Sequence, residues 1–177
     1  VEEHHLHVEV GDTRALKDPL VLDFGGTGAD LTGTRFAFDL DSDGRAERVP
    51  LVGPTSGLLA LDANGNGRID DGGELFGPGT GSGFAELAAL DADRSGWIDA
   101  GDAAYERLRV WSPAESGDGT LSTLAERGVG AIGLQQAATP FDLKDASNRP
   151  AGVIRRTGLY LADDGTVHLV QQLDFTV

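Results

Sequence analysis

The sequence Asp91-Ala92-Asp93-Arg94-Ser95-Gly96-Trp97-Ile98-Asp99-Ala100-Gly101-Asp102 has the spacing of a calcium-binding loop. Oxygen-bearing side chains stand at loop positions 1, 3, 5, 9 and 12, Gly96 at position 6 allows the sharp turn, and position 7 offers a backbone carbonyl. Calcium is a hard cation that takes several oxygen ligands at once. We therefore expect one ion to be bound by Asp91, Asp93, Ser95, Trp97, Asp99 and Asp102. Position 12 is Asp rather than the usual Glu, which predicts weak, millimolar affinity.

Apolar residues recur at helical spacing on both sides of this loop, in residues 84–90 and 103–108. The pattern predicts an EF-hand-like helix–loop–helix. We expect an α+β fold, with this unit and further calcium loops in the middle of the chain. Alternating or continuous apolar residues in 19–24, 34–40, 130–134, 151–156, 158–161 and 167–175 predict antiparallel strands toward both ends.

A second acidic loop begins at Asp39, with Asp41 and Asp43 at positions 3 and 5 and Gly44 at position 6. Position 12 falls on Pro50, whose side chain cannot bind a metal. Asp39, Asp41 and Asp43 therefore form either a shortened calcium site or an acidic hairpin turn.

A third acidic loop begins at Asp62 and ends at Glu74, one residue later than position 12. The adjacent glycines at 72 and 73 could absorb the extra residue. The candidate calcium ligands in this loop are Asp62, Asn64, Asn66, Arg68 (at position 7), Asp70 and Glu74.

The composition limits the classes of partner. The 177 residues carry a formal net charge of −15, so nucleic acid and anionic membranes are poor partners. Cysteine is absent, which excludes disulfides, thiol catalysis and zinc–thiolate sites, and no apolar run has membrane-spanning length. The chain also lacks methionine, so we expect it to be part of a longer protein with neighbouring domains.

Residues 1–17 are expected to form an upstream segment or strand, and residues 18–177 the calcium-binding module. His5 and His7, close to His4, lie on one face of an alternating stretch. They suit either a zinc or nickel site without a third ligand or a solvated strand face.

Among motifs for catalysis, no phosphate-binding loop, GxSxG elbow, HExxH or Cys–His pair is present, so a hydrolase acting on other molecules is disfavoured.

The order of the motifs resembles the self-processing module of FrpC-like RTX proteins, which are large calcium-dependent toxins and adhesins exported by Gram-negative bacteria. The resemblance covers residues 18–135 most clearly and the strand-rich tail more loosely. It rests on residues 18–23, 38–44, 57–71, 74–77, 83–91, 108–111 and 123–126, in that order.

The resemblance implies a secreted or cell-surface bacterial protein whose module folds on binding calcium and cleaves its own Asp18–Pro19 bond. Asp18 would attack its own backbone carbonyl to close a five-membered anhydride, and Pro19 would leave as a secondary amine. The new aspartyl end could then be joined to a lysine. The chain has only Lys17 and Lys144, so the lysine is expected on a partner protein.

Two loops depart from the family pattern. Residues 23–28 lack the second and third acidic positions, and the loop after Trp111 has Pro113 where an Asp is typical. The alternative to self-cleavage is therefore a calcium-stabilised structural or adhesive domain that no longer cuts.

Overall fold

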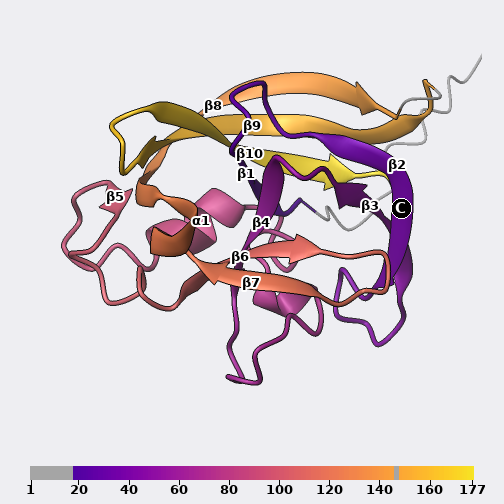
Figure 1. The fold of residues 1–177 in the computed structure, drawn as a ribbon, viewed down its shortest axis with the longest axis horizontal. Helices are drawn as coiled ribbons and strands as arrows, with labels where there is room; N and C mark the ends of the chain where they lie inside the picture. Colours follow the sequence, from indigo (N-terminus) through magenta and orange to yellow (C-terminus); the bar gives the residue numbers. More distant parts are fainter. Residues whose placement is uncertain (1–17, 146–147) are drawn as a thin grey trace, which may run out of the picture.

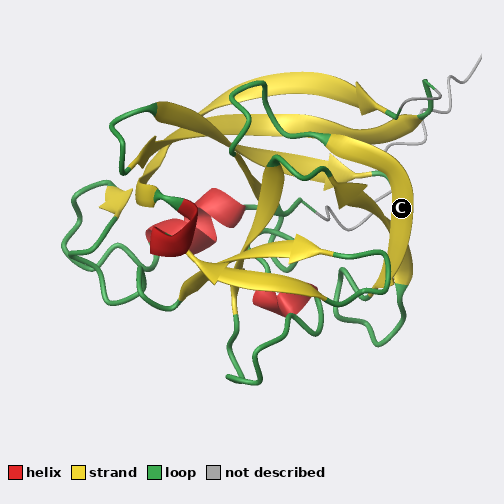
Figure 2. Ribbon diagram, in the orientation of Figure 1, coloured by secondary structure: helices red, strands yellow, loops and turns green. Residues whose placement is uncertain are grey.

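A computed structural model of the chain describes residues 18–145 and 148–177. Strands dominate the regular structure, and Figure 2 shows long yellow strands with few red helical turns. The elements in chain order are β1 (Leu20–Asp23), β2 (Leu31–Phe38), β3 (Glu47–Val52), β4 (Ser56–Leu61), η1 (Gly72–Glu74), α1 (Gly83–Ala88), β5 (Trp97–Ile98), β6 (Leu108–Pro113), β7 (Gly119–Thr123), η2 (Ala125–Arg127), β8 (Val129–Lys144), β9 (Pro150–Ala162) and β10 (Val167–Phe175).

The predicted α+β fold with an EF-hand-like helix–loop–helix is wrong. Strand accounts for 48% of the structure and helix for 8%. The helix before the central loop exists as α1, but residues 103–107 form turns and Leu108 already begins β6. Leu108 pairs with Leu61 of β4, so the apolar residues read as a second helix lead instead into the main sheet. Pairing with β4 therefore determines the structure at Leu108, and the helix that the apolar spacing of residues 103–108 predicted does not form.

Eight strands form one antiparallel sheet in the order β5-β8-β9-β10-β1-β4-β6-β7. Strands β2 and β3 form a separate two-stranded sheet. In Figure 1 the long strands β8 and β9 cross the top of the molecule, with β5 at one end and the β2–β3 pair at the other. The two ends carry different acidic loops, because β5 lies within the 91–102 loop and residues 39–46 connect β2 to β3.

The central strand β1 is buried on both faces, which explains its uninterrupted apolar sequence. Val21 belongs to the core cluster that includes Phe36 and Phe38 of β2. Leu20 and Leu22 belong to the second cluster, which includes residues of α1. Because side chains alternate along a strand, β1 joins the two halves of the core.

The predicted tail strands are present, with two differences. The strands predicted at 151–156 and 158–161 are one continuous strand, β9, and β8 continues to Lys144, ten residues beyond the predicted end at 134. Asp163-Asp164-Gly165 turns the chain between β9 and β10, where Gly165 N donates to Ala162 O at 2.9 Å.

The expectations for His4, His5, His7 and the 1–17 segment lie outside the described residues. Within the described ranges, no helix is long and apolar enough to cross a membrane.

Candidate functional site

The three acidic loops fold in the same way at their first residue. Each opening Asp accepts hydrogen bonds from backbone N–H groups at the turn of its own loop. The bonds run from Asp43 N (3.0 Å) and Gly44 N (2.8 Å) to Asp39, from Gly65 N (2.8 Å), Asn66 N (3.1 Å) and Gly67 N (2.8 Å) to Asp62, and from Ser95 N (3.1 Å) and Gly96 N (3.0 Å) to Asp91. The glycine at position 6 has positive φ in all three loops, which explains why the sequence places glycine there.

A closing carboxylate completes each loop. It accepts a hydrogen bond from the backbone N–H of loop position 2 and so ties the end of the loop to its beginning. The bonds are Leu40 N to Glu47 Oε2 (2.9 Å), Ala63 N to Glu74 Oε1 (3.0 Å) and Ala92 N to Asp102 Oδ1 (2.8 Å). Glu47 lies outside the predicted ligand set, because position 12 of a standard loop falls on Pro50. The first loop closes earlier, at position 9.

Two of the loops gather carboxylates closely enough to share one cation. Oxygens of Asp39, Asp41, Asp43 and Glu47 all lie within 4.8 Å of one another. The same holds for Asp91, Asp93 and Asp102 in the central loop. An all-oxygen donor set of this kind fits a hard cation such as calcium.

The central loop places its remaining predicted ligands less uniformly. Ser95 Oγ donates to the carbonyl of Trp97 at 3.2 Å, so these two oxygens face each other. Asp99 Oδ1 accepts from Gly101 N at 2.7 Å. A hydrogen bond from Ser95 N holds the pKa of Asp93 below its ordinary value, which keeps this carboxylate ionised.

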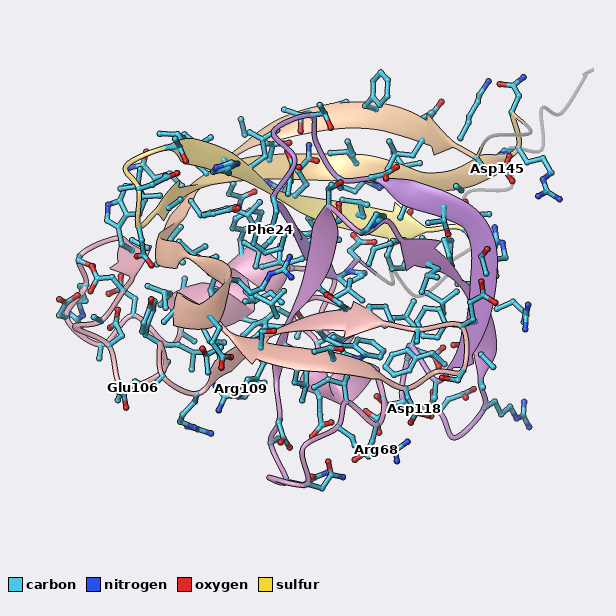
Figure 3. The ribbon with its side chains drawn as sticks, in the orientation of Figure 1. Phe24, Arg68, Glu106, Arg109, Asp118 and Asp145 are labelled. Carbon is cyan, nitrogen blue, oxygen red and sulfur yellow. The ribbon has the colours of Figure 1, made fainter. Side chains whose placement is uncertain are left out.

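In the 62–74 loop, amide groups take the places of two carboxylates. The Nδ2 atoms of Asn64 and Asn66 donate to Asp70 Oδ2 at 2.8 and 2.7 Å and lower the pKa of that carboxyl. Half a turn of each amide would place its oxygen, in place of its nitrogen, beside Asp70, where it could serve as a metal ligand. Arg68, a predicted ligand position, directs its guanidinium outward to Asp118, beside which it lies in Figure 3.

The 39–47 and 62–74 loops are in direct contact. Gly72 N donates to the carbonyl of Asp39 at 2.8 Å, and Ser42 Oγ donates to Asp71 Oδ1 at 2.8 Å. A Cβ on Gly72 would lie 1.8 Å from the carbonyl oxygen of Leu40. Only glycine permits this approach, so the two loops act as one structural unit.

In the loop at 23–28, which lacks two acidic positions, backbone N–H groups provide the hydrogen bonds to the remaining carboxylate. Asp23 is fully buried, and its carboxylate accepts from Gly25 N (2.8 Å), Gly26 N (3.0 Å) and Gly28 N (2.7 Å). Tyr160 donates its hydroxyl proton to the Asp23 carbonyl at 3.0 Å. The acidic positions lost from this loop are therefore not needed to fold it.

The Asp18–Pro19 bond lies at the start of the folded chain and is deeply buried. Asp18 is 2% exposed, and its Oδ2 accepts from Gln172 Nε2 at 3.1 Å. Burial raises the pKa of Asp18, and the charge of Asp174 adds to the rise; Gln172 and Arg155 act in the opposite direction. The other oxygen, Oδ1, has no hydrogen-bond partner among the described residues.

The backbone around this bond is held from both sides. Leu173 N donates to the Pro19 carbonyl at 3.1 Å, and Leu20 N donates to the Phe76 carbonyl at 3.0 Å. Gly77, with φ +120, packs so closely that a Cβ there would lie 2.0 Å from the Asp18 carbonyl oxygen. Glu86 of α1 fixes this glycine by accepting from Gly77 N at 2.8 Å.

The segment between two acidic loops therefore passes directly over the bond. Glu74 closes one loop three residues before Gly77, and Asp91 opens the next loop shortly after α1. Gln172, Gly77 and Glu86 were not singled out from the sequence. Gly77 and Glu86 lie within the 74–77 and 83–91 motifs, whereas Gln172 lies outside all of the motifs.

These features define a β-sheet domain with three acidic loops and one buried Asp–Pro bond. Comparison with protein families matches the SPM domain over residues 20–176, so the match begins directly after Pro19. The chain belongs to this family, the RTX-associated self-processing module.

Among curated proteins, the chain is similar to the iron-regulated protein FrpA of Neisseria meningitidis serogroup C, with 35% identity over 161 residues. The match covers 84% of this chain but only 14% of FrpA.

Proposed function

We propose that this domain folds around calcium and then cleaves its own Asp18–Pro19 bond, and that the new aspartyl end can be transferred to a lysine amine. The observation that carries the proposal is the position of residues 74–91. This segment belongs to two candidate calcium loops and also holds Gly77 against the Asp18 carbonyl. Order in the loops would therefore be transmitted to the reacting bond.

The candidate ligands are Asp39, Asp41, Asp43 and Glu47 in the first loop, Asp62, Asn64, Asn66, Asp70 and Glu74 in the second, and Asp91, Asp93, Ser95, Trp97, Asp99 and Asp102 in the central loop. Bound calcium would neutralise the clustered carboxylates and hold each loop closed. Without it, mutual repulsion opposes closure.

The cleavage step is balanced within the Asp18–Pro19 pair. An oxygen of the Asp18 carboxyl bonds to the backbone carbonyl carbon of the same residue, and the bond from that carbon to Pro19 N breaks. The proton of the neutral carboxyl ends on the departing proline nitrogen. The raised pKa of Asp18 supports this route, because burial favours the protonated form that supplies both the oxygen and the proton.

Incubation of the purified chain with millimolar calcium, followed by mass spectrometry, tests the proposal. We expect a peptide ending at Asp18 and a fragment beginning at Pro19, and neither product in EDTA. Asp18→Asn should stay intact, because an amide cannot close the anhydride in the same way, whereas the exposed Asp30→Asn should cleave like the parent. An intact chain with calcium bound would rule out cleavage.

A second candidate is a calcium-stabilised structural or adhesive domain that does not cut. It is favoured by the hairpin after Trp111, where Ala114 N donates to Asp118 O at 2.6 Å and Gly117 N to Ala114 O at 3.0 Å, so backbone bonds close the loop. The family and the FrpA match support a secreted or surface-exposed bacterial protein of toxin or adhesin type in either case.

A further inference from the structure

A pocket of about 390 Å³ opens beside the Asp18 carboxyl. It is lined by Asp18, Gly81, Ala138, Arg155, Arg156 and Gln172. Only 2% of the surface of Asp18 and 2% of the surface of Gln172 are exposed. Among the described residues, Asp18 Oδ1 and Gln172 Oε1 have no hydrogen-bond partner. A buried amide oxygen without a donor carries a free-energy cost, so Gln172 Oε1 suits a ligand that brings an N–H group.

The amide of Gln172 is held in one orientation. Its Nε2 donates to Asp18 Oδ2 at 3.1 Å and to the Gly81 carbonyl at 3.0 Å. Both donor positions are therefore used within the protein, and Oε1 is the part of the side chain left for a ligand.

Two arginines give the pocket a cationic rim. Arg155 pairs with Asp174 at 2.6 Å, whereas Arg156 donates to the neutral amide oxygen of Gln136 at 3.0 Å. They reach the same pocket although they are consecutive in β9, because the register with β10 shifts here: Arg156 pairs with Gln172 and Ile154 with Leu173. Arg155 is the extra residue of this bulge.

We propose that this pocket is the acceptor site for the amine that opens the aspartyl anhydride, and that it prefers a lysine flanked by acidic residues. The inference rests on the proposed function. Gln172 Oε1 accepts an N–H of the incoming amine and directs its nitrogen toward the Asp18 carbonyl carbon. Arg156 attracts the neighbouring carboxylates of the acceptor. The cationic rim also favours the neutral, nucleophilic form of the amine.

The transfer step is balanced without a further reactant. The amine nitrogen bonds to the backbone carbonyl carbon of the anhydride, and the carbon–oxygen bond of the anhydride breaks. The Asp18 side-chain carboxyl is restored and takes up the proton that the nitrogen loses. Water competes for the same carbon and gives a free Asp18 end instead.

The test is a competition between two short peptides, each with one lysine, flanked in one by glutamates and in the other by arginines. The full chain is incubated with calcium and both peptides, and mass spectrometry measures the adduct of residues 1–18 with each. The acidic peptide should give roughly two to five times more adduct, the range of a single exposed ion pair. Arg156→Glu should reverse the order.

Ala138→Trp should fill the pocket and lower the ratio of adduct to free Asp18 end. Its matched control is Ala137→Trp, which is exposed and points to the other face of the strand, and which should retain the parent ratio. Equal adduct from both peptides, or an unchanged ratio in Ala138→Trp, would overturn the acceptor site.

A binding measurement separates this inference from the proposed cleavage. In the Asp18→Asn chain with calcium, the acidic peptide should shift the NMR signals of the Gln172 side-chain amide and the Gly81 backbone amide. Binding without cleavage in the parent would overturn the proposed function and leave the pocket as a binding site. Cleavage in the parent without these shifts would overturn the pocket alone.

Discussion

Replacing Glu47 with glutamine should remove one bound calcium ion while barely changing the loop itself. The amide oxygen can still accept from Leu40 N, which lies 2.9 Å from the carboxylate in the parent. The change removes one negative charge from a group of four carboxylates whose oxygens lie within 4.8 Å of one another. The loss should therefore appear in the response to calcium rather than in calcium-free stability.

Linkage gives the magnitude. An ion that binds only the folded chain raises the free energy of unfolding by about 1.4 kcal/mol for each tenfold rise in calcium above its dissociation constant. Three occupied loops give the parent a slope of about 4.1 kcal/mol per tenfold rise, and Glu47→Gln should reduce it to about 2.7 kcal/mol.

The assay is urea unfolding at calcium concentrations from about 1 to about 30 mM, the range of weak loops. An Asp18→Asn background keeps the chain intact. Glu115→Gln makes the same change of charge at an exposed residue and should keep the parent slope. If Glu47→Gln also keeps that slope while Asp102→Asn lowers it, the first loop holds no ion and the reasoning is refuted.

Three further predictions concern the fold. Chelation with EDTA should lower the melting temperature, since each ion at ten to a hundred times its dissociation constant contributes about 1.4–2.7 kcal/mol; identical melts would contradict this. Gly72→Ala should cost about 1–3 kcal/mol by urea unfolding, because its Cβ would meet the Leu40 carbonyl at 1.8 Å, whereas Gly33→Ala, with open space around it, should be nearly neutral. Burial, and then the charge of Asp23, raises the pKa of Tyr160 from 10.0 to about 12. The neutral hydroxyl therefore contributes its full stabilisation of the folded chain below pH 10, and this contribution is lost as the pH rises through about 12. Tyr160→Phe should therefore lose about 1 kcal/mol below pH 10 for the missing hydrogen bond, and unfolding at pH 8 to 11 should show the gap narrowing above pH 10.

The acidic loops could be located from the sequence because their interactions are local. Asp91 reaches the N–H groups of Ser95 and Gly96, only four and five residues away. Spacing alone therefore describes the loop. Glu47 was not predicted as a ligand, because a standard loop closes at position 12 and this loop closes at position 9. Its position shortly after Gly44 was the only sequence signal for it.

The sheet and the pocket could not be obtained in this way. Leu108 has the apolar spacing of a helix, and only its pairing with Leu61 across the sheet makes it a strand residue. Gln172 reaches Asp18 over 154 positions of sequence. Contacts at such separation leave no periodic pattern, so a buried glutamine on a predicted strand carried no signal for a site.

The bulge at Arg155 has an evolutionary consequence. A regular strand would direct Arg155 and Arg156 to opposite faces, so only every second residue could contribute charge to one face. The bulge brings two adjacent, exposed residues to the rim of one pocket, whose floor includes the buried side chains of Asp18 and Gln172. Their identities can vary between relatives without repacking the interior. In the acceptor site proposed above, substitutions at these two positions would change the preferred acceptor and leave the folded core unchanged.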